Sequence, residues 1–191
     1  LKWIMGTKPF LILELDSHSA DAGIDTRVEA FLDIIEGYRN KIDKIEEERY
    51  DNGLRFRNDG NLYIENINSG EKFPVMHSDK VEMIVSNMGE IASELVATAL
   101  SAQGFNARSM PVADAKTLEH ARNYMSGKEC VPSQLVLGGA LKFMASPEFR
   151  KDKLYALFVP ITTGPCRTGQ YYVFYENLFK DLRIDNVVVF T

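Results

Sequence analysis

Residues 154–190 read LYALFVPITTGPCRTGQYYVFYENLFKDLRIDNVVVF, and this stretch decides the fold. Residues 154–161 form a compact apolar run, and residues 187–190 form a second one. Between them, residues 168–182 carry aromatic and aliphatic side chains at helical spacing. A buried strand, a helix and another buried strand predict a βαβ unit, in which both strands lie parallel in one sheet.

The same alternation extends toward the N-terminus. Apolar runs at residues 10–15, 81–85 and 105–110 predict three more strands. Helical patterns begin at about residue 25 and recur over residues 91–103, 114–124 and 132–144. Strands that alternate with helices of this length predict an α/β fold, with a mostly parallel, doubly wound sheet covered by helices on both faces.

Residues 39–80 depart from this pattern. The turn dipeptides Asn52-Gly53, Asp59-Gly60 and Ser69-Gly70 separate short segments of alternating polarity. They predict a small β-rich insertion at the periphery of a single α/β domain that spans residues 1–191.

Charge and hydropathy limit the classes of function that the sequence supports. The net charge is -5 and no basic block is present, so a nucleic-acid partner is not predicted. The sequence contains no signal peptide and no apolar run long enough to cross a bilayer, which predicts a cytoplasmic protein without a membrane partner. The chain starts at Leu1 and stops inside an apolar run, so we expect it to be a fragment of a larger protein.

The two cysteines occupy similar loop-to-helix positions. Cys130 lies in GKECVP, where Pro132 suits the first turn of the next helix. Cys166 lies in TTGPCR, after the strand predicted at 154–161 and before the last helix, with Arg167 beside it. The free N–H groups at a helix N-terminus favour a thiolate or an anionic cluster bound through it. Metal ligands, inert buried thiols and a redox disulfide all remain open at this stage.

Other residues carry weaker signals. His18, in the polar segment DSHSAD, is either an acid–base group or ligand, or an exposed residue of a turn. His77 and His120 are predicted to be surface or packing residues. The aromatic residues of the last helix are predicted to form its core face, and Gly138-Gly139 is predicted to allow close helix packing.

Three segments together resemble a known family. They are residues 10–31, residues 125–137 (MSGKECVPSQLVL) and residues 164–171 (GPCRTGQY). They resemble the C-terminal part of the large fused CoA-substrate-specific enzyme activases, which are relatives of the 2-hydroxyglutaryl-CoA dehydratase subunits and the double-cubane cluster proteins. The resemblance runs through most of the chain in order and is weakest over residues 39–80.

The resemblance implies a flavodoxin-like fold and an iron–sulfur cluster of the 4Fe–4S type. It implies that Cys130 and Cys166 are cluster ligands and therefore approach each other, and that further ligands and an ATPase domain lie elsewhere in the parent chain. The parent would then serve ATP-driven, low-potential electron transfer to an acyl-CoA dehydratase partner in anaerobic metabolism, and the fragment alone would be inactive. The alternative is an α/β domain that binds an acyl-CoA or a partner protein and holds no cluster.

Overall fold

A computed structural model describes residues 8–13, 21–43, 51–125, 129–161 and 166–191. The contacts within the chain divide it into two compact units, Leu1–Tyr50 and Asp51–Thr191, and each is described by itself. A single domain over residues 1–191 therefore stays a prediction.

The first unit contains one described helix, α2 (Asp21–Arg39), which begins a few residues before the position expected from the sequence. The strand predicted at residues 10–15 is wrong for its described part, because residues 10–13 form no strand. An apolar run becomes a strand only when a neighbouring strand takes its backbone hydrogen bonds, and periodicity alone does not reveal that neighbour.

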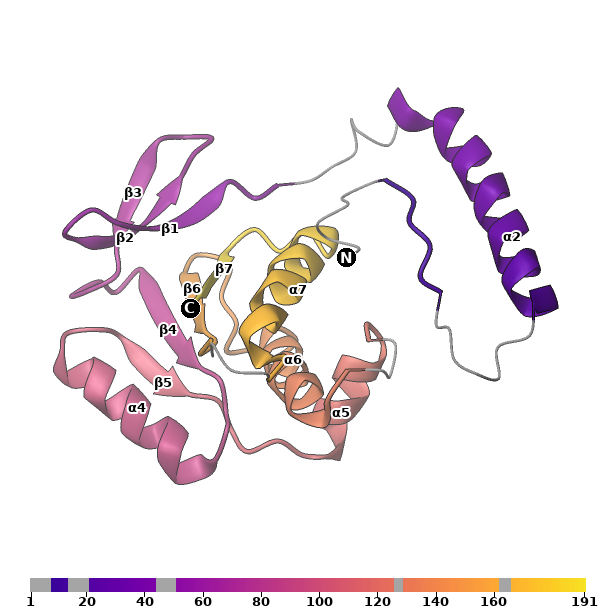
Figure 1. Ribbon diagram of the computed structural model, residues 1–191. Coiled ribbons are helices and arrows are strands. Elements are labelled where there is room, and N and C mark those ends of the chain that lie inside the picture. The colour runs from indigo at the N-terminus through magenta and orange to yellow at the C-terminus, as the bar shows by residue number, and fades with distance from the viewer. Residues whose placement is uncertain (1–7, 14–20, 44–50, 126–128, 162–165) are drawn as a thin grey trace. The chain divides into compact units, whose positions relative to one another are not determined.

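The second unit is built on a parallel sheet (Figure 1). Its strands are β4 (Val81–Val85), β5 (Ala107–Ser109), β6 (Leu154–Phe158) and β7 (Val187–Phe190), in the order β5-β4-β6-β7. This confirms the α/β class with a parallel sheet. The runs at 105–110 and 154–161 form shorter strands than expected, Ala107–Ser109 and Leu154–Phe158.

Alternate residues of these strands face two different layers. On one face, Tyr155 and Leu157 of β6 pack with the helices α6 (Val131–Met144) and α7 (Thr168–Asp181). A shorter helix, α5 (Ala115–Arg122), packs against α6. On the other face, Ala156 of β6 belongs to a separate cluster, against which Leu100 of α4 (Glu90–Ala102) packs. Helices therefore cover both faces, as predicted.

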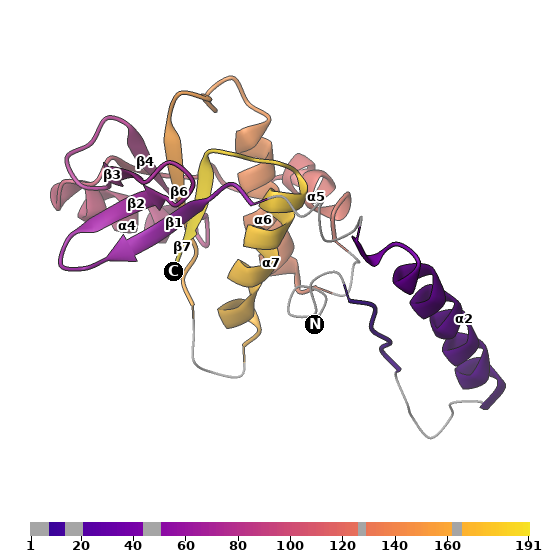
Figure 2. The same cartoon turned by 90° about the horizontal axis from the view of Figure 1, so that it is seen from above.

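A three-stranded antiparallel sheet completes the second layer (Figure 2). It consists of β1 (Leu54–Asn58), β2 (Leu62–Asn66) and β3 (Glu71–Pro74), joined by the turns expected from the sequence. Leu54 and Ile64 are buried in the same cluster as residues of β4, β6 and β7. The segment thus forms a small β-rich sheet of its own, and its apolar side covers part of the parallel sheet.

In the part of the chain that the structure describes, no helix is both long and apolar enough to span a bilayer.

Candidate functional site

The candidate site lies at the carboxyl ends of β4 and β6. These strands are neighbours in the middle of the sheet, and the chain leads from them to β5 on one side and β7 on the other. Parallel sheets bind ligands where the strand order reverses in this way. A small pocket there is lined by residues that follow β4 and β6 and by the first turns of α6 and α7, among them Ser86, Pro160, Ser133 and Tyr171. Its volume of about 30 Å³ is close to that of one water molecule.

Cys130 is the N-cap residue of α6, as the sequence predicts. Its backbone is extended (φ -66°, ψ 149°), and Pro132 lies in the first turn of the helix. The backbone N–H of Gln134 donates to the carbonyl oxygen of Cys130 at 3.2 Å, and the Gln134 side chain donates to the carbonyl oxygen of Glu129 at 2.9 Å. These bonds hold the start of α6 while the Cys130 thiol remains exposed.

Cys166 lies two residues before the first residue of α7. Its Sγ atom is 3.1 Å from the hydroxyl oxygen of Thr168, and the thiol is exposed. Hydrogen bonds from the Thr168 side chain and backbone lower the pKa of the Cys166 thiol below its ordinary value. Such a setting favours the thiolate, which is the form of cysteine that binds metals and acts as a nucleophile.

Two hydrogen-bonded connections join the starts of α6 and α7. The hydroxyl of Tyr171 donates to the Sγ atom of Cys130 at 3.2 Å. Deeper in the molecule, the hydroxyl of Tyr175 donates to the carbonyl oxygen of Ser133 at 3.0 Å and lies 2.9 Å from its side-chain oxygen. Burial is the main cause that raises the pKa of both tyrosines, so both hydroxyls keep their protons at neutral pH.

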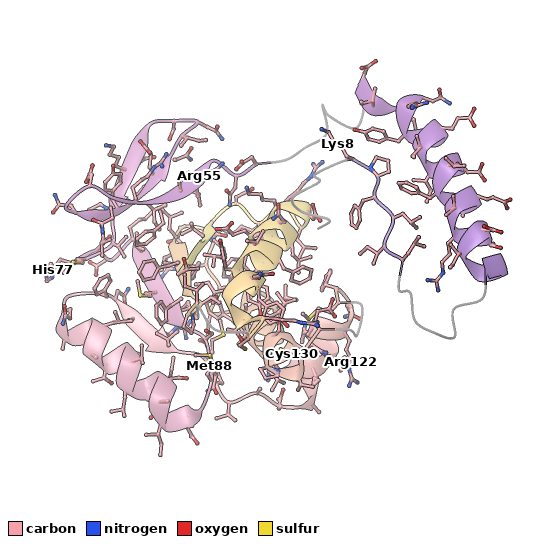
Figure 3. The ribbon with its side chains drawn as sticks, viewed as in Figure 1. Lys8, Arg55, His77, Met88, Arg122 and Cys130 are labelled. Carbon is pink, nitrogen blue, oxygen red and sulfur yellow. The ribbon has the colours of Figure 1, made fainter. Side chains whose placement is uncertain are left out.

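Each cysteine thus contacts the first turn of α7, although 35 residues separate the two in the sequence. Cys166 contacts Thr168 and Cys130 contacts Tyr171. Residues three apart in a helix lie on the same face, so both thiols contact one face of the first turn of α7. Figure 3 labels Cys130 where α6 and α7 lie beside each other. The exposure of both thiols rules out the interpretation of Cys130 and Cys166 as buried core cysteines.

The described residues do not by themselves form a metal site. Within the described ranges, no group of three or more His, Cys, Asp or Glu side chains is placed to hold a metal ion. Two thiols amount to half of the four thiolates that hold a cubane cluster. Further ligands would have to come from residues beyond those described.

The remaining sequence candidates have different outcomes. His18 and residues 162–165 lie outside the described residues. His77 is exposed, and His120 is half-buried on α5, as expected of surface or packing residues. The aromatic residues of α7 form its core face as predicted, with Tyr175 and Phe179 buried and Tyr171, Tyr172 and Phe174 packed against the same cluster.

The sequence analysis did not identify Thr168 and Ser133 as residues of the site, and it did not predict the hydrogen bonds of Tyr171 and Tyr175. One local pattern in the sequence pointed to them. Ser133 follows Cys130 by three residues, and Tyr175 follows Tyr171 by four, so each pair shares a helix face. The sequence could not indicate that these two faces meet.

Comparison with known proteins adds no assignment. No protein-family model, no curated protein and no solved structure matches the chain.

Proposed function

We propose that this chain contributes Cys130 and Cys166 as thiolate ligands to an iron–sulfur cluster of the 4Fe–4S type. The cluster would belong to a larger cytoplasmic protein that resembles the activases of 2-hydroxyacyl-CoA dehydratases. The observation that carries the proposal is that two exposed thiols each contact a hydroxyl group in the first turn of α7, Cys166 that of Thr168 and Cys130 that of Tyr171.

The electrostatic setting supports this role. Both cysteines adjoin helix N-termini, whose free N–H groups stabilise negative charge on thiolates. Arg167, the N-cap residue of α7, adds a positive charge next to Cys166. When bound, an iron–sulfur cluster supplies a one-electron redox centre whose potential depends on such charges and hydrogen bonds.

The topology supports the finer fold assignment. Numbered along the chain, the parallel strands have the order 2-1-3-4. The flavodoxin-like order is 2-1-3-4-5, and it places ligands at the junction of strands 1 and 3. In this chain that junction lies between β4 and β6, where the pocket beside Tyr171 is found. We therefore propose a flavodoxin-like unit with its cysteines at the usual ligand-binding edge.

The test is anaerobic iron and acid-labile sulfide analysis of the full-length protein. Cys130→Ala and Cys166→Ala should each lower the bound iron and abolish low-potential electron transfer, because each removes a thiolate. ATP hydrolysis by an upstream domain should remain. Thr98→Ala, at an exposed position of α4, is the control and should keep the wild-type iron content.

The result that contradicts the proposal is full iron content together with full electron transfer in both cysteine variants. In that case the cysteines are structural. Binding of an acyl-CoA by an iron-free protein would instead favour the ligand-binding alternative.

A further inference from the structure

A larger cavity runs along the outer edge of β7, the last strand of the parallel sheet. Its volume is about 520 Å³, within the range of about 300–1,000 Å³ that is usual for ligand sites. Both α7 and β1 contact β7, α7 on one face of the sheet and β1 on the other (Figure 1). Residues of all three elements line the cavity, and neither cysteine is among the described residues that do so.

The backbone of Val189 points to this open edge. β6 bonds to alternate residues of β7, because the N–H group of Tyr155 donates to the carbonyl oxygen of Asn186 and its register partner is Val187. Val187 and Val189 therefore point their backbone groups away from β6. The carbonyl oxygen of Val187 accepts a hydrogen bond from the Asn52 side chain at 3.2 Å. The N–H and C=O groups of Val189 make no hydrogen bond to another residue that the structure describes.

The side of the cavity nearest β1 is apolar. Phe56 of β1 stacks on Phe190 of β7, with the ring centroids 4.4 Å apart. Leu54 and Leu62 line the same side of the cavity. This surface favours apolar side chains in whatever lies along β7.

The side of the cavity formed by α7 carries a carboxyl group. Glu176 lines the cavity, is half-buried, and forms no hydrogen bond or direct ion pair with another described residue. Arg55 and Lys180 also line the cavity, but they bind Asp51, at 2.6 and 3.5 Å. A half-buried carboxylate without a bonded cation is complementary to a basic group on a ligand.

We propose that the edge of β7 binds an extended segment of a partner protein, which adds to the parallel sheet as a fifth strand. An edge strand presents N–H and C=O groups that pair with another extended chain. Side chains of the added strand alternate between the two faces of the sheet. The segment therefore carries apolar side chains toward Phe56 and a lysine or arginine toward Glu176. Every described strand already belongs to one of the two sheets, and we therefore assign the segment to a partner.

The probe is the synthetic peptide acetyl-Thr-Val-Lys-Val-Thr-amide, titrated into the intact protein in a calorimeter. The same peptide with glutamate in place of lysine should bind about tenfold more weakly, because it places a second carboxylate beside Glu176. Glu176→Gln should remove this preference. Glu94→Gln, at an exposed position of α4, is the control and should keep it.

N-methylation of the peptide tests the backbone pairing. One isomer is methylated on the two valine amides and the other on the threonine and lysine amides. A strand that pairs along one edge uses the amides of alternate residues only, so one isomer should lose binding and the other should keep it. Hydrogen exchange of the Val189 amide should slow when the unmethylated peptide is bound.

The proposal is overturned if the lysine peptide does not bind, if both methylated isomers bind equally, or if exchange at Val189 is unchanged. A preference for lysine that survives in Glu176→Gln overturns the role of Glu176. A protein that sediments as a dimer and protects Val189 without any peptide has a second copy at this edge, which overturns the assignment to a partner.

Discussion

The hydroxyl of Tyr175 on α7 lies 2.9 Å from the hydroxyl of Ser133 on α6, and both side chains are buried. The pair joins two helices that follow different loops of the chain. Ser133 follows Cys130 by three residues and Tyr175 follows Tyr171 by four, so the pair lies about one helical turn from the contact between Tyr171 and Cys130.

Tyr175→Phe should destabilise the second unit by about 1–3 kcal/mol, because the buried Ser133 hydroxyl loses its partner. Urea denaturation followed by circular dichroism measures the change. Tyr172→Phe should change the free energy of unfolding by less than about 0.5 kcal/mol. Equal stability of the Tyr175→Phe variant and the wild type would contradict the importance of this buried pair.

Gly138→Ala should destabilise the protein although alanine favours helices. A Cβ atom at Gly138 would overlap the backbone carbonyl oxygen of Thr117, where α5 packs against α6. Overpacking of this kind costs about 1–3 kcal/mol or more, which exceeds the gain of about 1 kcal/mol in helix propensity. At Gly139 a Cβ atom would meet only the flexible Met110 side chain at 3.2 Å. Thermal unfolding should therefore show a clearly lower midpoint for Gly138→Ala than for Gly139→Ala.

Ile64→Ala tests whether the antiparallel sheet belongs to the folded core. Ile64 is fully buried at 0% exposure, so its truncation should cost about 2–5 kcal/mol. Ile67, in the turn after β2, is 49% exposed, and Ile67→Ala should cost less than about 0.5 kcal/mol. If both variants unfolded at the same urea concentration as the wild type, the antiparallel sheet would not contribute to the stability of the core.

Glu176→Gln should stabilise the protein at pH 7. Burial raises the pKa of the Glu176 carboxyl above its ordinary value of 4.5, an effect that the nearby Lys180 and Arg55 partly oppose. A raised pKa means that the folded state holds the proton more tightly than the unfolded state. The stabilisation is complete below about pH 4.5 and is lost as the pH rises through the folded-state pKa.

The measurement is the free energy of unfolding between pH 4 and 8. The wild type should lose stability across the lower part of this range, and Glu176→Gln should lose less. Glu94→Gln, at an exposed position of α4, should follow the wild-type curve. Parallel curves for Glu176→Gln and the wild type would show that this carboxyl does not contribute.

Much of the candidate site could be predicted from short stretches of sequence. Pro132 after Cys130 indicated a helix start, and the thiol is indeed at the N-cap of α6. Cys166 between an apolar run and an amphipathic stretch indicated a strand-to-helix loop, and it lies two residues before the first residue of α7. Capping and proline effects act within one helix turn, so a few neighbouring residues determine them.

The limits of prediction appear at residues 10–15 and in β1–β3. The apolar run at 10–15 looked like a buried strand, yet its described part is not extended into a sheet. The short segments around Ile64 were expected to form a β-rich insertion, and the sequence did not indicate that their apolar side packs with Val81 and Ala156. In both cases the structure depends on which part of the chain, far away in the sequence, is available as a partner for pairing or packing. No local sequence pattern contains that information.

The sequence by itself determined most of the element types of residues 81–191, the α/β class and the placement of each cysteine beside a helix start, because backbone propensity, capping and burial periodicity are local properties. Only the tertiary structure decided the strand order β5-β4-β6-β7 and the meeting of α6 with α7. That meeting brings the Tyr171 hydroxyl to the Cys130 sulfur across 41 residues. Such a contact depends on the hydrogen bonds that buried side chains such as Tyr175 and Ser133 form with each other in place of water. Which side chains meet in this way is a property of the packed chain as a whole.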